Sequence, residues 1–277
     1  MTRPVSKLAK SDVLAGLFAA WDGIDRLLDG LPESAWETPT SLPGWDVRAV
    51  VSHLIGTESM LMGVATPAAD LDVTGLEHVR NDIGAMNECW VRHLSGESGA
   101  TLRQRLLAVT HDRRRLLGEM SEDDWNAPAQ TPAGPDSYGR FMRIRTFDCW
   151  MHEHDIRDAL GRPASDDDLS GPAARLALDE MAASMGYVVG KLGRAPDGSR
   201  VAIELTGPLA RTIRVAVDGR GQLVDDFGGL EPTATIRLDG LLFTRLAGGR
   251  TDNTEGVELD GDRQLAARIV QHLDYVI

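Results

Sequence analysis

Four polar side chains of one segment are spaced so that a helix would place them on a single face. The segment reads RIRTFDCWMHEHDIRDALG and spans residues 143–161. At about 100° per residue, the four side chains fall within roughly 80° of one another. They are Arg145, Asp148, His152 and Asp155. A carboxylate and an imidazole four residues apart can reach the same ion, so this face predicts two ligands of a metal site.

Such a site needs a further ligand from another part of the chain. Catalytic zinc sites use three protein ligands and leave the fourth position to water or substrate. His53 is the best candidate, because it departs from the apolar stripe of its own expected helix and lies near the middle of that helix. A metal-free hydrogen-bonded pair of Asp148 and His152 is the alternative, and neither interpretation names a reaction. His154, turned about 200° from His152, is expected to be exposed.

The cysteine count and the charge balance exclude several other kinds of chemistry. Cys89 and Cys149 are the only cysteines, too few for a disulfide framework or a four-cysteine zinc site, so nitrogen and oxygen must hold any metal. The 42 acidic and 29 basic residues give a formal net charge of −13, which disfavours nucleic acid as a partner. Because no run of about 18 apolar residues and no signal-peptide core occur, we expect a cytoplasmic protein without a membrane partner.

The elements expected to position these residues are helices. Apolar residues recur at helical spacing through the N-terminal part of the chain, interrupted by segments rich in proline, glycine and polar residues. The expected helices span residues 11–29, 46–62, 74–94, 102–120 and 138–160. Ser11 is expected to cap the first of them. Long amphipathic helices joined by loops favour an antiparallel bundle, with sites between facing helices.

A second domain of a different class is expected after a linker at residues 161–172, so that the domains span residues 1–162 and 163–277. A helix is expected at 173–192, followed by three segments in which apolar and polar residues alternate, as in strands. These are residues 201–206, 213–217 and 234–238, and further helices are expected at 241–247 and 264–273. The pattern predicts a small α+β domain with an antiparallel sheet covered by helices on one face.

Several stretches together resemble a known family. They are LPGWDVRAVVSHLIGTE at 42–58, HVRNDIGAMNECWV at 78–91 and DCWMHEHDIRDALGRP at 148–163, with LAGGRTD and DGDRQLAARIV nearer the C-terminus. The chain resembles the mycothiol-dependent maleylpyruvate isomerase-like family. The resemblance implies a DinB-like four-helix bundle followed by a small sterol carrier-like α+β domain. It also implies that zinc or another divalent metal is bound by His53, Asp148 and His152, although relatives commonly carry glutamate at the position of Asp148.

The resemblance further implies a reaction that uses the small thiol mycothiol. A metal ion would lower the pKa of the thiol from about 8.5 and make it a nucleophile at neutral pH. The expected protein is a mycothiol-dependent S-transferase or isomerase that acts on a small electrophile, as a monomer or homodimer. Asp155 and Arg157 are implied in cofactor binding, and Arg80, Asp155 and Arg250 in catalysis. The alternative is a non-enzymatic small-molecule-binding or regulatory protein on the same fold.

Overall fold

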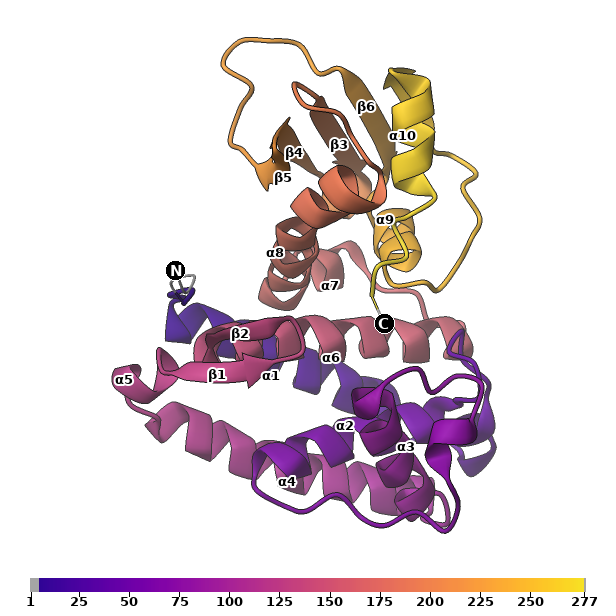
Figure 1. The fold of residues 1–277 in the computed structure, drawn as a ribbon. Coiled ribbons are helices and arrows are strands. Elements are labelled where there is room, and N and C mark those ends of the chain that lie inside the picture. The colour runs from indigo at the N-terminus through magenta and orange to yellow at the C-terminus, as the bar shows by residue number, and fades with distance from the viewer. Residues whose placement is uncertain (1–4, 277) are drawn as a thin grey trace. The chain divides into compact units, whose positions relative to one another are not determined.

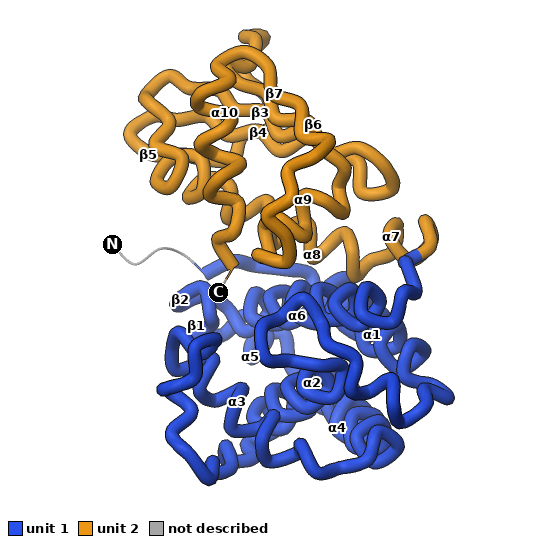
Figure 2. Tube along the Cα trace, turned by 90° about the vertical axis from the view of Figure 1, so that its right-hand side faces the viewer, with its two compact units in different colours: residues 1–164 blue, residues 165–277 orange. Residues whose placement is uncertain are grey.

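Long helices, each with one buried face, build the N-terminal part of the chain (Figure 1). The computed structural model describes residues 5–276, and the chain divides into two units, residues 1–164 and 165–277 (Figure 2). The long helices of the first unit are α1 (Lys10–Leu28), α2 (Val47–Leu61), α3 (Asp82–Leu94), α4 (Gly99–Glu119) and α6 (Tyr138–Leu160). Shorter elements between them are η1 (Glu33–Glu37), η2 (Val73–Gly75) and α5 (Glu122–Trp125).

Side-chain caps fix the starts of the two helices that carry the predicted metal ligands. The Asp46 carboxylate accepts a hydrogen bond from the backbone N–H of Ala49 (2.8 Å) at the start of α2. The Ser137 hydroxyl accepts one from the backbone N–H of Arg140 (3.1 Å) at the start of α6. The sequence-based ranges of both helices are confirmed to within one residue.

Two other helix predictions are wrong in detail. Helix α1 begins at Lys10 after Ala9, which has no capping side chain, so Ser11 lies inside the helix and does not cap it. The helix expected at 74–94 divides into η2 and α3, because the Asn81 side chain caps a new helix there by accepting from the backbone N–H of Gly84 (2.8 Å). Residues 76–81 therefore form a loop.

The N-terminal unit is not entirely helical, contrary to expectation. Residues 128–137 form an antiparallel hairpin of β1 (Pro128–Thr131) and β2 (Gly134–Ser137). Prolines at 128, 132 and 135 are incompatible with a helix interior, and Gly134 adopts φ +93° at the turn. The strands are short and polar, so they lack the alternation that predicted the other strands.

Helices α2 and α6 meet inside the bundle and bring distant parts of the sequence together. Helix α1 packs along α6, and α2 packs against α3, α4 and α6. Gly56 allows α3 to approach α2 closely, because a Cβ atom at this position would lie 2.3 Å from the ring of Trp90. The close packing of α2 against its neighbours buries most of its residues, including the polar ones that belong to the site.

The second unit contains a mixed sheet. Its strands are β3 (Arg200–Thr206), β4 (Arg211–Asp218), β5 (Arg220–Leu223), β6 (Ala234–Asp239) and β7 (Glu258–Gly261), in the order β5-β4-β3-β6-β7. Strand β6 pairs with β3 in parallel, with Ile203 opposite Ile236, so the expectation of a purely antiparallel sheet is wrong. The chain reaches β6 by crossing over from β5 at one edge to the far side of β3, and this connection makes the pair parallel.

Helices complete the second unit, and the predicted fold class is confirmed. They are α7 (Asp166–Ser170), α8 (Pro172–Tyr187), the π-helical turn η3 (Val188–Leu192), α9 (Gly240–Ala247) and α10 (Arg263–Val270). Helix α8 packs against β4 and β5, and α10 packs against β6. No helix within residues 5–276 is long and apolar enough to cross a membrane.

Candidate metal centre

Three predicted ligands, His53, Asp148 and His152, lie together between α2 and α6, and we refer to them as the trio. Nε2 of His53 lies 3.3 Å from Oδ2 of Asp148, and Nε2 of His152 lies 3.5 Å from Oδ1 of the same carboxylate. One ligand atom from each residue can be chosen so that all three lie within 4.8 Å of one another. The histidines are only 4% and 6% exposed, whereas the side chain of Asp148 is 29% exposed. The trio is therefore enclosed by protein but accessible from the side of Asp148.

Hydrogen bonds behind the two imidazole rings determine which nitrogen of each ring faces the trio. Nδ1 of His152 lies 2.9 Å from Oδ2 of Asp155, an ionised carboxylate that can only accept, so Nδ1 carries the proton. Nδ1 of His53 lies 3.4 Å from the Thr57 hydroxyl, which itself donates to the His53 carbonyl (3.1 Å) and thus accepts from the ring. We assign both tautomers from this network. Both Nε2 lone pairs then point toward Asp148.

The donor set fits a divalent cation. Two Nε2 lone pairs and one carboxylate are all electron-pair donors, and facing one another they require a proton or a cation between them. Two atoms bound tetrahedrally to zinc at about 2.0–2.1 Å lie roughly 3.3 Å apart. Each histidine Nε2 lies at a similar distance from one oxygen of Asp148, 3.3 Å from Oδ2 for His53 and 3.5 Å from Oδ1 for His152. With one ligand atom taken from each residue, all three lie within 4.8 Å of one another. The short side chain of Asp148 reaches both histidines. The carboxylate of Asp155 behind His152 is the kind of outer partner that orients metal-binding imidazoles.

The surrounding charges favour an ionised Asp148. Burial alone would raise the pKa of Asp148, but the Arg145 guanidinium and then the two histidines lower it well below its usual range. Burial lowers the pKa of His53 and outweighs its attraction to Asp148. Burial also lowers the pKa of His152, but the carboxylates of Asp148 and Asp155 have the larger combined effect, so the pKa of His152 is raised.

Arg145 belongs to a buried ionic network that the sequence did not reveal. Its guanidinium binds Asp148 on one side and Glu58 of α2 on the other, and Glu58 also pairs with Arg113 of α4. Glu58 and Arg113 are completely buried. The available signal in the sequence was the charged Glu58 on a largely buried helix. Its partners Arg113 and Arg145 lie 55 and 87 residues away along the chain, so the sequence did not indicate them.

Trp45 forms one wall beside the trio. Its ring centroid lies 5.3 Å from that of His53 and 6.2 Å from that of His152. The indole N–H donates to Oε2 of Glu88 (3.2 Å), and the same carboxylate contacts His78 (3.2 Å) and Arg92 (3.1 Å). Glu88 belongs to α3 and is buried. Its contacts therefore connect the loop before α2 and the loop before α3 to this helix. Neither Trp45 nor Glu88 was predicted as a site residue.

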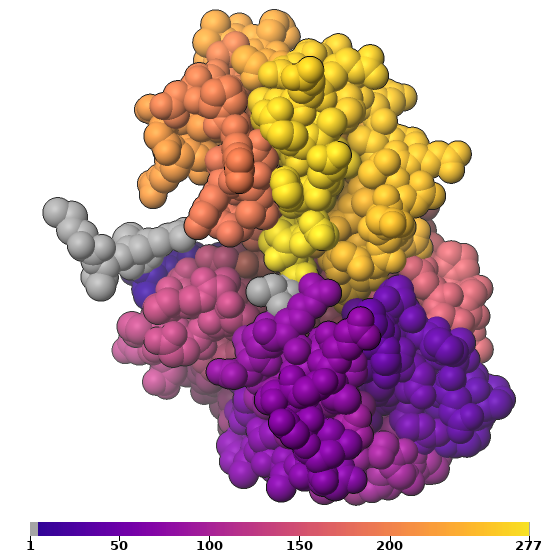
Figure 3. Space-filling model, turned by 45° about the vertical axis from the view of Figure 1, so that its right-hand side comes forward, coloured from indigo at the N-terminus to yellow at the C-terminus, as the bar shows by residue number. Residues whose placement is uncertain are grey.

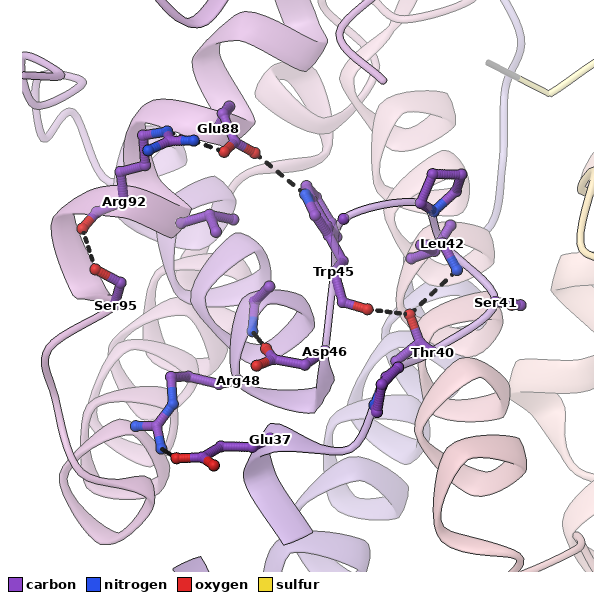
Figure 4. A pocket seen from close by; sticks show the side chains of 15 residues that line it. Glu37, Thr40, Ser41, Leu42, Trp45, Asp46, Arg48, Glu88, Arg92 and Ser95 are labelled. Atoms are coloured by element: carbon purple, nitrogen blue, oxygen red, sulfur yellow. Dashed lines mark hydrogen bonds and ion pairs between the residues drawn. The ribbon is translucent and has the colours of Figure 1, made fainter. Parts of the chain in front are cut away.

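A cavity of about 780 Å³ borders two residues that contact the site (Figure 4). Ser41 lines this cavity and donates a hydrogen bond to Oδ1 of Asp155 (3.3 Å). Trp45 also lines it, while the three trio side chains are not among the described residues that do. Arg48 and Arg92 add charged groups, each paired with a glutamate. The cavity is lined by polar and apolar residues in similar measure and lies entirely within the first unit.

The remaining predicted residues lie in different surroundings. Arg80 is exposed in the loop before α3. Purple in Figure 3 marks part of the surface of the first unit. Arg157 is buried and donates two hydrogen bonds to Oε1 of Glu153 (2.9 and 2.8 Å). Arg250 lies in the second unit, where its guanidinium donates to the Gly248 carbonyl (2.6 Å). Their roles in catalysis or cofactor binding stay predictions.

Two other side chains of α6, those of His154 and Cys149, lie outside the trio. His154 is half-buried and not fully exposed as expected, because its ring packs on Trp150 with centroids 4.2 Å apart. Cys149 is fully buried, with its sulfur 3.5 Å from Nη2 of Arg145. Burial is the main cause that raises the pKa of the Cys149 thiol to about 12.

The fold and the trio define a two-unit protein with a candidate metal centre inside a helical bundle. The family model of the mycothiol maleylpyruvate isomerase N-terminal domain matches residues 17–157, and that of the MDMPI C-terminal domain matches residues 175–268. The chain belongs to the mycothiol-dependent maleylpyruvate isomerase family.

Individual proteins and solved structures are also similar to this chain. Two strains of Mycobacterium tuberculosis each have an uncharacterized protein that is 28% identical over 165 residues. This match covers 55% of the chain and 58% of each relative, so it spans little more than half of their length. A crystal structure of the mycothiol-dependent maleylpyruvate isomerase has a TM-score of 0.60 at 18% identity, covering 94% of this chain and 96% of that one. A histidine-to-alanine mutant of that enzyme, with the same coverage, gives 0.59 at 17% identity. At these identities the structural likeness shows the fold.

Proposed function

We propose that this chain is a metal-dependent enzyme that uses mycothiol as a thiol cosubstrate or cofactor. It would isomerise a small electrophile by reversible addition of the thiol, or transfer the thiol to it. The observation that carries the proposal is the convergence of three ligand atoms within 4.8 Å, inside the region matched by the family model. The structural relative is named as a mycothiol-dependent isomerase, and this name suggests the thiol and the type of reaction proposed here.

His53, Asp148 and His152 would hold the ion, and the nitrogen–oxygen donor set favours zinc. A divalent cation in this position would lower the pKa of a bound thiol from about 8.5, so that the thiolate forms at neutral pH. The chain contributes the orientation of the ligands, because Asp155 keeps the Nδ1 proton of His152 directed away from the trio. The Trp45 ring lies beside the two imidazoles, and the site stays accessible from the side of Asp148.

The thiol of Cys149, next to Asp148 in the sequence, is poorly suited to be the nucleophile. Cys149 is completely buried, and its pKa is raised to about 12, so the thiol is protonated at neutral pH. Its sulfur lies beside Arg145, on the inner side of α6. The mycothiol sulfur would therefore supply the electron pair that attacks the electrophile.

The proposed chemistry forms one carbon–sulfur bond. In a transfer, the bond to the leaving group breaks and that group takes the electron pair. In an isomerisation, the π electrons of the attacked double bond move to a conjugated carbonyl oxygen, and the new single bond rotates. The electron pair then returns and expels the thiolate. Arg80 would bind an anionic group of the substrate, and Arg250 is a second candidate for this role.

The partners expected for this reaction are mycothiol and a small electrophile in the cytoplasm. Metal analysis of the purified full-length protein, followed by assays of mycothiol consumption with several electrophiles, tests the proposal. We expect about one divalent metal per chain by analogy with single catalytic zinc sites, and thiol consumption that requires this metal. Metal-loaded protein that neither binds nor consumes mycothiol would contradict the enzyme proposal and favour the non-enzymatic binding protein.

A further inference from the structure

A chain of buried charges runs from the trio into the core of the first unit. Oε1 of Glu58 accepts hydrogen bonds from Nε and Nη2 of Arg145 (3.1 and 2.8 Å). The third nitrogen of this guanidinium, Nη1, donates to Oδ2 of Asp148. One planar group therefore bridges the carboxylates of α2 and α6, and the Asp148 carboxylate is held from the side opposite His152.

The guanidinium of Arg145 has little freedom to move. The planar fork of arginine binds two carboxylates with fixed geometry, unlike the single ammonium group of lysine. Glu58 is itself held by Nε of Arg113 (2.9 Å), whose two remaining nitrogens each donate to the Tyr138 hydroxyl (3.2 Å). The Arg145 side chain is only 4% exposed, so water cannot easily replace these contacts.

The network is electrically balanced before any ion binds. Arg113 and Arg145 carry two positive charges, and Glu58 and Asp148 carry two negative charges. An unbalanced arginine this close to a cation site would repel the cation. Glu58 thus allows a guanidinium to contact a metal-ligating carboxylate without an excess of positive charge at the centre.

We propose that Arg145 is a positioning residue of the metal centre: Glu58 fixes its guanidinium, which holds the Asp148 carboxylate between His53 and His152. The proposal rests on the proposed function in assigning a metal ion to the trio. An aspartate carboxylate can otherwise rotate about its terminal bond, and that freedom would have to be lost each time an ion binds. The hydrogen bond from Arg145 removes this freedom in advance.

Charge and orientation predict opposite effects when Arg145 is removed. Arg145→Gln eliminates a positive charge near the ion, so charge alone predicts tighter metal binding. Loss of orientation predicts weaker binding, by about 10- to 100-fold, as is typical when a partner of a metal ligand is lost. Arg113→Gln removes the same charge and another hydrogen bond of Glu58, but it leaves the contact between Arg145 and Asp148 in place. It is therefore a matched control.

The experiment measures zinc dissociation constants of the full chain by competition with a chromophoric chelator. Cobalt absorption spectra of the same variants report the ligand geometry. We expect Arg145→Gln to weaken zinc binding by about 10- to 100-fold and to alter the cobalt spectrum. We expect Arg113→Gln to weaken zinc binding less than Arg145→Gln does, with an unchanged cobalt spectrum, because Glu58 keeps both of its hydrogen bonds with Arg145 and Arg145 keeps its contact with Asp148. Arg140→Gln, which removes the ion pair between the partly buried Arg140 of α6 and Asp136 of β2, controls for general loss of stability.

Arg145→Lys keeps the charge and serves as a second variant should Arg145→Gln fold poorly. Lysine lacks the planar fork, so we expect weakened zinc binding and an altered cobalt spectrum with this variant also. Wild-type affinity and spectrum in both Arg145 variants would overturn the proposal, as would equal weakening in Arg113→Gln. Wild-type protein that binds neither ion would overturn both this proposal and the metal site. Protein that binds zinc in the predicted order of affinities but does not consume mycothiol would contradict only the proposed function.

Discussion

Replacing Asp155 by alanine tests whether the orientation of His152 controls the affinity for the metal. Asp155 is 2% exposed, and its Oδ2 lies 2.9 Å from Nδ1 of His152. A hydrogen bond to a charged group contributes about 1.5–3 kcal/mol. Because both partners are buried, no large reduction for solvent screening is needed. This range corresponds to a dissociation constant weaker by about 10- to 150-fold.

The assay is a zinc competition titration combined with thiol turnover at low and at saturating zinc. If Asp155 acts through His152, Asp155→Ala lowers the zinc affinity, and excess zinc restores most of the turnover. Asp155→Asn keeps a neutral acceptor and should give a smaller loss of affinity. Asp158→Asn, an exposed carboxylate one turn further along α6, is the control and should leave the zinc affinity unchanged. Wild-type zinc affinity in Asp155→Ala with low turnover at every zinc concentration would refute this reasoning and place Asp155 on the thiol or substrate instead.

Four further predictions address the site and its support. His152→Ala should lose stoichiometric zinc, as measured by elemental analysis after gel filtration; full retention would place the ion elsewhere. Cys149→Ser should keep turnover within a few-fold, and a loss of several hundred-fold with metal intact would identify a protein nucleophile. Glu58→Ala leaves two guanidinium groups without their shared carboxylate and should cost about 3–5 kcal/mol in chemical denaturation, whereas a loss below 1 kcal/mol would show that the pair relaxes easily. Arg80→Ala should lower kcat/KM for an anionic electrophile by about 10- to 150-fold and spare a neutral one, and equal losses for both would exclude a charge contact.

The sequence was most informative for features that depend only on neighbouring residues, such as the position of a helix and the residues that share one of its faces. Periodic apolar residues predicted α2, and the spacing of Asp148 and His152 predicted that they share one face of α6. Helical geometry makes that spacing meaningful over four residues, without reference to the rest of the chain. The choice of His53 depended on its departure from an apolar stripe, and the structure brings it beside Asp148.

Features that depend on distant partners were missed. Glu58 looks like any helical glutamate until Arg113 and Arg145 are placed beside it by the packing of α2 against α4 and α6. The parallel pairing of β6 with β3 depends in the same way on strand order. The hairpin at 128–137 escaped detection for a local reason, because its strands are short and polar.

The proposed function requires that a thiol bind at an ion held by His53, Asp148 and His152. The most direct test is to titrate mycothiol into cobalt-loaded full-length protein and to follow the near-ultraviolet absorption for a thiolate-to-cobalt charge-transfer band. We expect this band to appear and saturate with mycothiol in the wild type and to be absent in His152→Ala. A cobalt spectrum that mycothiol leaves unchanged, in protein shown to hold cobalt at the trio, would contradict thiol binding at this ion.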